Sequence, residues 1–412
     1  MHIPPIQQRF QVSFAYNVYF TEGLFNRENP LLHDAIAQDG GTGLKKIFIV
    51  IDNHVAEAQA NLIGDIKAYF DQYPQFLQLV GEPLIVPGGE QCKNDPAFVQ
   101  QILNVVNELG IDRHSYILVI GGGAVLDMVG YAASIAHRGI RHIRIPTTVL
   151  AQDDSAVGVK NSINAFGKKN FLGTFTPPNA VINDFNLLLT LSDREWRAGI
   201  AEAIKVALIK DADFFRFLQQ NAAKLARRDM TAMQYLIHRS AAMHVQHIGS
   251  GDPFEKGSSR PLDFGHWSAH KLEPLSNYQI RHGEAVALGI ALDSTYSYLK
   301  GMLTRDELDQ ILEVLQVVGF EIYVPEMETH LEDAKHPNSL LHGLQEFREH
   351  LGGQLTIMLL AGLGHGVDVH EMQDALIIQA IKILQERSLN QQQKSSPQEN
   401  SPQSTVHSPQ KK

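Results

Sequence analysis

Residues 115–134 have the sequence SYILVIGGGAVLDMVGYAAS: a short apolar run, three glycines, and a stretch with helical spacing. The apolar run predicts a buried strand and the last part predicts a helix, so Gly121, Gly122 and Gly123 form the turn between them. Glycines at such a turn let the backbone approach a pyrophosphate closely, and the helix N-terminus offers free N–H groups. Leu126 replaces the third glycine of the usual dinucleotide pattern, so a tight turn without a ligand is the alternative.

Strand and helix patterns alternate on both sides of this turn. Short apolar runs predict buried strands, and the segments between them have the 3.6-residue spacing of helices. This alternation implies parallel strands with right-handed crossovers, and therefore a Rossmann-like α/β domain. Besides the strand before the glycines, the predicted strands are 45–52, 83–89 and 142–148, and the predicted helices are 60–73 and 95–110.

The pattern changes near residue 190. From about Asp193 onward, long stretches have helical periodicity and strand signals are scarce. We therefore expect a Rossmann-like domain over 1–190 and a mainly helical domain over 191–389. Residues 390–412 are rich in Gln, Ser and Pro and have little apolar surface to bury, so we expect a disordered tail.

The composition narrows the class of protein. A chain of 412 residues with 44% hydrophobic residues can bury a large core. Its formal net charge of −10 argues against nonspecific binding of nucleic acid or of an anionic membrane. Cys92 is the single cysteine, which fits a reducing compartment. The chain starts without a signal-peptide pattern and has no apolar run of about 20 residues, so we expect a cytoplasmic protein.

Polar residues follow several of the predicted strands. Asp52 ends the strand at 45–52, where a carboxylate can hold a ribose hydroxyl, and Glu90 and Lys93 follow the strand at 83–89. Open parallel sheets bind ligands at this edge, so these residues favour a nucleotide site over a solvated turn.

Residues 144–175 are difficult to explain as scaffold. The stretch RIPTTVLAQDDSAVGVKNSINAFGKKNFLGTF is too polar for a core and too apolar for a solvated linker. We therefore expect a loop that carries function, and its basic residues suit an anionic substrate such as a phosphate or carboxylate. A surface loop with incidental lysines is the alternative. The polar residues concerned are Thr147, Thr148, Asp154, Lys160, Lys169 and Asn170.

Three histidines lie close together in residues 261–286. His266 and His270 are four residues apart and so share a helix face, and His282 begins the next helical pattern. Glu202 lies among alanines and isoleucines, where a buried carboxylate needs a cation, and Lys205 is on the same face. The alternative is a buried Glu–Lys pair beside unrelated core histidines, but together these residues favour a metal site. The spacing does not decide whether His270 is a ligand or a proton-transfer group.

Seven motifs along the chain resemble those of the 3-dehydroquinate synthase family of sugar-phosphate cyclases, and they occur in the same order as in that family. The resemblance covers the chain except the tail. It implies a Rossmann-like domain followed by a helical metal- and substrate-binding domain, and a homodimer. It also implies an enzyme that uses NAD and a zinc or cobalt ion to convert a sugar phosphate into a carbocycle with release of phosphate. The motifs are GGGAVLDMVG, AHRG, IPTTVLAQDDSAVGVK, GKKN, REWRAGIAEAIK, LDFGHWSAHKLE and RHGEAVALG.

The resemblance also implies roles for individual residues. Glu202, His266 and His282 would be the metal ligands, and His270 would bind substrate and its phosphate. The other residues form two groups. The nicotinamide cofactor would be held by Asp52, Glu90, Lys93, Gly121, Gly122, Gly123, Asp127, Thr147, Thr148, Lys169, Thr190, Leu191 and Glu195, and the substrate by Arg138, Asp154, Lys160, Asn170 and Lys205.

The chain departs from the family pattern near the substrate. Where dehydroquinate synthases have LNFGHTFGHA, this chain has LDFGHWSAHK, with Asp263 and Trp267 at altered positions. The family's substrate-binding lysine has no counterpart, because His244 or Val245 is at that place. Loss of a charged partner for a desolvated carboxylate costs about 2–5 kcal/mol. We therefore hypothesise a divergent member whose substrate lacks the carboxylate.

Three alternative functions follow from the same motifs. The segment FREHLGG is similar to cyclases of the valiolone type, which act on sedoheptulose 7-phosphate, although those usually have proline at the place of His270. A metal-dependent polyol dehydrogenase of the glycerol type would share the architecture but would not need residues that bind a substrate phosphate. A noncatalytic binding protein on the same fold would be expected to have lost metal ligands, and none is lost.

Overall fold

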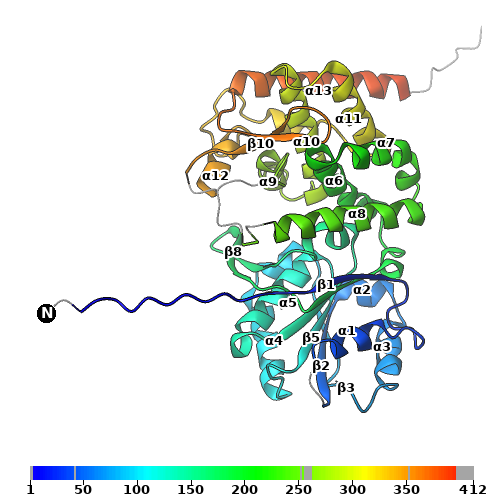
Figure 1. The fold of residues 1–412 in the computed structure, drawn as a ribbon. Helices are drawn as coiled ribbons and strands as arrows, with labels where there is room; N and C mark the ends of the chain where they lie inside the picture. The colour runs from blue at the N-terminus through cyan, green and yellow to red at the C-terminus, as the bar shows by residue number, and fades with distance from the viewer. Residues whose placement is uncertain (1–2, 41–42, 251–252, 255–261, 351–352, 396–412) are drawn as a thin grey trace, which may run out of the picture.

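The computed structural model describes residues 3–40, 43–250, 253–254, 262–350 and 353–395. Figure 1 shows a sheet with flanking helices formed by the first half of the chain and a bundle of helices formed by the second half.

A seven-stranded parallel sheet forms the first half. Every pairing between its strands is parallel, as the alternation of strands and helices predicts. The strands expected from the sequence are confirmed, whereas β1, β3 and β9 were not predicted. In sheet order the strands are β1 (Asn17–Thr21), β9 (Ala180–Asp184), β6 (Arg141–Pro146), β5 (Tyr116–Gly121), β2 (Lys45–Asp52) and β3 (Leu77–Leu79), and β4 (Leu84–Val86) also pairs with β2.

Helices cover both faces of this sheet, because successive side chains of each strand point to opposite faces. In β2, Phe48 and Val50 pack into one hydrophobic cluster, whereas Ile47, Ile49 and Ile51 pack into another. The first cluster includes residues of α4 and α5, and the second includes residues of α1 and α3. These helices are α1 (Leu31–Ala37), α2 (Asn53–Ala58), α3 (Leu62–Phe70), α4 (Pro96–Glu108) and α5 (Gly123–Ile135).

The polar stretch at 144–175 is not a loop, and that expectation was wrong. After β6 it forms a π-helical turn, η3 (Ala151–Ser155), and then the antiparallel hairpin β7 (Lys160–Ala165) and β8 (Lys168–Phe175). The fully buried Arg144 holds this segment, since its guanidinium donates to the carbonyl oxygens of Ala156, Gly158 and Lys160. It also donates to the side-chain oxygen of Asn161. The sequence predicted a loop because the stretch is polar. Polarity does not reveal that the buried Arg144 binds the backbone of this segment.

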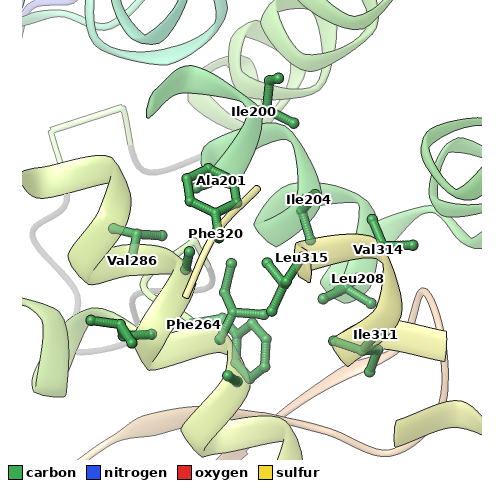
Figure 2. Packing of buried hydrophobic residues seen from close by; sticks show 14 of the residues in the cluster. Ile200, Ala201, Ile204, Leu208, Phe264, Val286, Ile311, Val314, Leu315 and Phe320 are labelled. Atoms are coloured by element: carbon green, nitrogen blue, oxygen red, sulfur yellow. The ribbon is translucent and has the colours of Figure 1, made fainter. Parts of the chain in front are cut away.

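The second half is a helical bundle built around α6 (Asp193–Lys210). Figure 2 shows Ile204 and Leu208 of α6 near Leu315 of α11 and Phe264 before α9, in one hydrophobic cluster. Because α6 is packed on all sides, the residues around its carboxylate, Glu202, are apolar. The other helices are α7 (Ala212–Ala226), α8 (Met230–Gly249), α9 (His266–Leu275), α10 (His282–Leu299), α11 (Arg305–Val318), α12 (His342–His350) and α13 (Asp374–Ser395).

Short elements complete the described chain. A small antiparallel hairpin in the helical half was not predicted, and α13 continues past residue 389 to Ser395. The last strand of the large sheet ends at Asp184 and α6 begins at Asp193, so the boundary at 190 lies in the connection and stays a prediction. The remaining short elements are β10 (Ile357–Leu360), β11 (Gly366–Val369), η1 (Glu90–Lys93), η2 (Ala136–Arg138), η4 (Phe185–Leu188) and η5 (Pro325–Glu328).

Residues 396–412, most of the predicted tail, lie outside the described part of the chain. Within the described ranges, no helix is both long enough and apolar enough to cross a membrane.

Candidate metal and dinucleotide site

Three helices meet at the candidate metal centre because their backbones approach closely. Gly265, in the left-handed region with φ of 77°, precedes α9, and a Cβ there would lie 2.7 Å from the backbone nitrogen of Ile290 in α10. A Cβ on Gly283 of α10 would collide with the backbone of Ala198 in α6. These contacts place the start of α9 against the middle of α10, and the first turn of α10 against α6.

The result is a cluster of Glu202 from α6, His266 from α9 and His282 from α10. Oε1 of Glu202 lies 3.7 Å from Nε2 of His266 and 3.5 Å from Nε2 of His282. Both distances exceed those of good hydrogen bonds. Two ligands of a tetrahedral zinc ion, each about 2.0–2.2 Å from the metal, are separated by roughly 3.3–3.6 Å. The three side chains therefore have nearly the spacing of ligands around one metal ion.

The chemical state of these side chains also fits a metal site. Glu202 is fully buried, and its Oε1 has no hydrogen-bond partner among the described residues. Nδ1 of His266 is 3.2 Å from the carbonyl oxygen of Phe264, so Nδ1 carries the hydrogen and Nε2 keeps its lone pair. Burial, with the charge of Lys205, lowers the pKa of His266 to about 4, which keeps the ring in the neutral form that binds metals.

His282 differs from His266 because it lies between two carboxylates. Burial lowers its pKa, but Glu202 and Glu273 raise it more, to about 10. Nε2 of His282 faces Glu202 and Nδ1 faces Glu273, at 3.6 Å from Oε2. Nε2 must lose its proton before it can bind a metal, so metal binding competes with protons at this position.

A buried chain of charges continues from Glu202. Lys205 forms an ion pair with Glu202 and lies 4.0 Å from Asp154 of η3. Burial opposes ionisation of all three, yet the pKa of Lys205 is raised and that of Glu202 falls well below its usual range, because each stabilises the charge of the other. The pKa of Asp154 is lowered against burial by His244 and Lys205.

His244 completes this chain of charges. It is buried in α8, with Nε2 3.0 Å from Oδ1 of Asp154 and Nδ1 2.9 Å from the carbonyl oxygen of Ser240. Both ring nitrogens of His244 therefore face oxygen atoms, one from a carboxylate and one from a backbone carbonyl. The sequence had indicated only that His244 or Val245 stands at the place of a family lysine, and not that His244 pairs with Asp154.

The predicted dinucleotide residues converge at the carboxyl ends of β2, β5 and β6. Gly122 precedes α5, and the backbone N–H of Thr147 donates to the carbonyl oxygen of Gly121 at 3.0 Å. A Cβ on Gly121 would lie 3.1 Å from Cβ of Asp52, and one on Gly122 would lie 3.5 Å from Thr148. The N-terminal turn of α5 is therefore a narrow backbone surface of the kind that binds a pyrophosphate.

A second polar network connects η1, α5 and the hairpin. The buried Lys93 lies 2.9 Å from Oδ2 of Asp127 and also bonds to Asn170, whose φ is 55°. Burial opposes its charge, but Asp127 and Glu90 raise the pKa of Lys93 on balance. Glu90 accepts from Asn164 of β7 at 3.0 Å. The network fixes the hairpin to the edge of the sheet where the glycine turn lies.

Lys169 connects the dinucleotide region with the metal region. Its Nζ lies 2.8 Å from Oε1 of Glu273 in α9 and 5.7 Å from the centre of the Tyr278 ring. Glu273 is buried, and it was not among the predicted site residues. A sequence signal was present, because Glu273 is seven residues after His266 and three after His270 and so shares their helix face.

The remaining predicted residues are placed less closely. Thr190 is exposed and Leu191 half-buried in the segment before α6, and Glu195 pairs with Arg281. His270 has its ring centre 5.4 Å from that of His266 and 6.0 Å from that of His282, and it keeps an exposed edge. Desolvation by the surrounding protein and the two neighbouring imidazoles lower its pKa.

Arg138 and Lys160 are not brought to the metal cluster by any contact among the described residues. Arg138 is exposed in η2 after α5, at the opposite end of that helix from the glycine turn. Lys160 is exposed at the start of β7, and its backbone carbonyl is bound by Arg144. Their substrate-binding roles stay predictions.

This fold and site define a class of protein with a parallel Rossmann-like sheet, a glycine turn before a helix, and a Glu–His–His cluster in a helical domain. Models of the 3-dehydroquinate synthase N-terminal and C-terminal domains match residues 83–198 and 199–337. The chain belongs to the 3-dehydroquinate synthase family.

Individual relatives agree with this assignment. The 3-dehydroquinate synthase of Dictyoglomus turgidum is 35% identical over 75% of this chain and 85% of its own length. That of Nitrosococcus oceani is 36% identical over 86% of this chain and 92% of its own length. A solved structure of 2-epi-5-epi-valiolone synthase from Streptomyces hygroscopicus, with NAD+ and Zn2+ bound, is 28% identical and has a TM-score of 0.81. The match covers 93% of this chain and all of that one.

Proposed function

We propose that the protein is a phosphate-eliminating sugar-phosphate cyclase that uses NAD and a zinc or cobalt ion. The observation that carries this proposal is the cluster of Glu202, His266 and His282, next to a glycine turn, in a member of this family. NAD would supply a reversible acceptor for hydride, and the metal would polarise an oxygen of the substrate. Because NAD would be regenerated within each turnover, the overall reaction would be a lyase reaction and not a net oxidation.

The residues of the candidate site fit both the metal ion and NAD. The unpartnered oxygen of the buried Glu202 and the free Nε2 of His266 are suited to a borderline cation such as zinc. The backbone of Gly121–Gly123 leaves space at the N-terminus of α5 that a side chain would fill. Asp52 lies beside this turn, although its carboxylate also accepts from the backbone N–H of His54 at 2.9 Å.

The chain's own charges would hold an anionic substrate. Lys205 is fixed as a cation by Glu202 and Asp154, directly beside the metal cluster, where its ammonium group could donate to an oxygen of the substrate. Lys160, Asn170 and His270 would contribute further donors to the phosphate, as the family pattern implies. A leaving phosphate would be stabilised as an anion by the same groups.

A more specific proposal concerns the substrate. Of the two residues at the place of the family's carboxylate-binding lysine, His244 is buried and already faces Asp154, and Val245 carries no charge. Neither residue offers an unpaired cation to a substrate carboxylate. This observation favours a substrate without the carboxylate, such as sedoheptulose 7-phosphate, over the seven-carbon acid phosphate of a dehydroquinate synthase.

The test uses purified protein with NAD+ and Zn2+ and two substrates in parallel. With 3-deoxy-arabino-heptulosonate 7-phosphate and with sedoheptulose 7-phosphate, released phosphate, absorbance of NADH and product mass are measured. We expect phosphate release and a carbocycle from sedoheptulose 7-phosphate, without accumulation of NADH. Activity on the carboxylate substrate alone would refute the substrate proposal while leaving the cyclase proposal intact.

The same experiment separates the alternative functions. A polyol dehydrogenase would accumulate NADH with glycerol and release no phosphate. A noncatalytic binding protein would bind a sugar phosphate without turnover. Homodimer formation and a cytoplasmic location stay predictions, and sedimentation of the purified protein tests the first.

A further inference from the structure

Glu273 is a buried carboxylate placed between the two halves of the candidate site. Each of its oxygens faces a different group: Oε1 lies 2.8 Å from Nζ of Lys169, and Oε2 lies 3.6 Å from Nδ1 of His282. Oε2 is a buried atom with no hydrogen-bond partner within the described residues. Lys169 comes from β8 of the sheet domain, and His282 begins α10 of the helical domain.

Among the residues that the structure describes, two groups could hold a metal ion, and both include His282. One consists of Glu202, His266 and His282, and the other of His270, Glu273 and His282. The two ring nitrogens of one imidazole point in different directions, so they cannot bind the same ion. Since Nε2 faces Glu202 and Nδ1 faces Glu273, a metal bound with Glu202 and His266 leaves the Nδ1 hydrogen directed at Glu273.

We propose that Glu273 is a positioning residue that orients His282 towards the metal and at the same time holds Lys169 towards the dinucleotide. The inference rests on the proposed function, because it takes the metal and NAD to bind where that function requires. A carboxylate that accepts from the outer nitrogen of a metal-bound histidine fixes its ring and increases its basicity. Here the second oxygen of the same carboxylate is bound to a lysine from the other domain, so the two binding sites would be coupled.

The backbone around Glu273 makes such a role possible, because it is held firmly. Its carbonyl oxygen accepts from the hydroxyl of Ser276 at 2.9 Å and from the backbone N–H of Tyr278 at 2.7 Å. The ring of Tyr278 in turn lies under Lys169. The end of α9 is therefore a closed turn that presents both the carboxylate and an aromatic face to the same ammonium group.

The first test measures metal affinity by competition with a chelator in the Glu273→Gln variant. Loss of such an outer carboxylate weakens metal binding about 10- to 100-fold, and we expect a weakening in this range for Zn2+. NAD+ affinity, measured by calorimetry on the zinc-loaded protein, should also fall. Lys169→Met should weaken NAD+ binding but leave zinc affinity unchanged.

Glu346→Gln is a matched control. Oε1 of Glu346 contacts Nζ of Lys271 at 2.7 Å and Nδ1 of His342 at 3.0 Å, so it also joins a lysine of α9 to a histidine, here one of α12. It lies outside both candidate metal groups. Glu346→Gln should therefore leave zinc and NAD+ affinities at the values of the unmodified protein.

A second measurement needs no substitution. If Glu273 couples the sites, zinc should tighten NAD+ binding in the unmodified protein, and NAD+ should tighten zinc binding by the same factor. Equal NAD+ affinities with and without zinc would overturn the inference, as would zinc affinity of Glu273→Gln within twofold of the unmodified protein or binding of a second zinc through Glu273. These binding measurements do not depend on turnover, so an inactive protein that binds zinc and NAD+ with this coupling would refute only the proposed function.

Discussion

Trp267→Phe should destabilise the protein through one identifiable carboxylate. Trp267 follows the candidate metal ligand His266, and its buried indole nitrogen donates to Oδ1 of Asp293 at 2.9 Å. Oδ2 of the fully buried Asp293 accepts from the backbone N–H of Gly265 at 3.1 Å. Asp293 thus bonds to both sides of His266, and phenylalanine would remove one of these bonds.

The magnitude has two parts. A buried acceptor that loses its donor costs about 1–3 kcal/mol. The smaller ring leaves a cavity that costs about 1–2 kcal/mol on the scale of large-to-small core substitutions. We therefore expect the free energy of unfolding to fall by about 2–5 kcal/mol.

Urea unfolding of a double-mutant cycle separates the two parts. Trp267→Phe, Asp293→Ala and the double variant should give a coupling energy of about 1–3 kcal/mol, because the hydrogen bond can be lost only once. Trp196→Phe is the control, since Trp196 is equally buried but donates to the carbonyl oxygen of Leu225, at 2.8 Å. A coupling below about 0.5 kcal/mol between Trp267 and Asp293, or an equal coupling of Trp196 with Asp293, would refute the reasoning.

Three further changes test other parts of the structure. Burial raises the pKa of Asp293 to about 7, so the folded state holds this proton more tightly than the unfolded state does, and the associated stability is lost as pH rises from about 4 to 7. Asp293→Asn should therefore gain stability relative to the unmodified protein over that window, by up to about 1.4 kcal/mol per pH unit, and a flat difference in urea unfolding would contradict this. Arg144→Met removes the donor to four acceptors and should cost about 3–5 kcal/mol of unfolding free energy, with Arg144→Lys recovering only part; an unchanged urea midpoint would contradict the role given to Arg144. Gly283→Val should collide with Ala198, separate α10 from α6 and weaken zinc binding on the order of tenfold or more, and unchanged zinc affinity would show that this close approach does not place His282.

The sheet half was largely predictable because local patterns determine it. Residues 47–51 and 116–120 are apolar throughout, which is typical of strands buried on both faces, and Gly121–Gly123 mark the turn into α5. β1 and β9 were missed because β1 is half-buried at the sheet edge and β9 lies beside a long polar stretch. The hairpin at 160–175 was missed because its strands are stabilised by a distant buried arginine and not by an alternating apolar pattern.

Some residues of the candidate site could likewise be predicted from local sequence patterns, whereas some of its contacts depend on residues far apart in the chain. The sequence suggested Glu202 because a carboxylate in an apolar helix needs a partner, and histidine spacing suggested His266, His270 and His282 together. The family resemblance, and not the spacing, separated His270 from the predicted ligands. The pairing of Glu273 with Lys169 and that of His244 with Asp154 could not be predicted, because each depends on which elements face one another. Helical spacing gives the face of one helix, whereas the distance from Glu273 to Lys169 depends on how the two halves of the chain pack.

The central claim is that the Glu202 cluster holds the metal of a phosphate-releasing cyclase. The most direct measurement is inorganic phosphate released from sedoheptulose 7-phosphate and from 3-deoxy-arabino-heptulosonate 7-phosphate, by the unmodified protein and by Glu202→Gln, each with NAD+ and Zn2+. We predict one phosphate per carbocycle from the unmodified protein, without net NADH, and loss of both zinc binding and phosphate release in Glu202→Gln. Absence of phosphate release from both substrates by the zinc-loaded protein, or equal release by Glu202→Gln, would contradict the account.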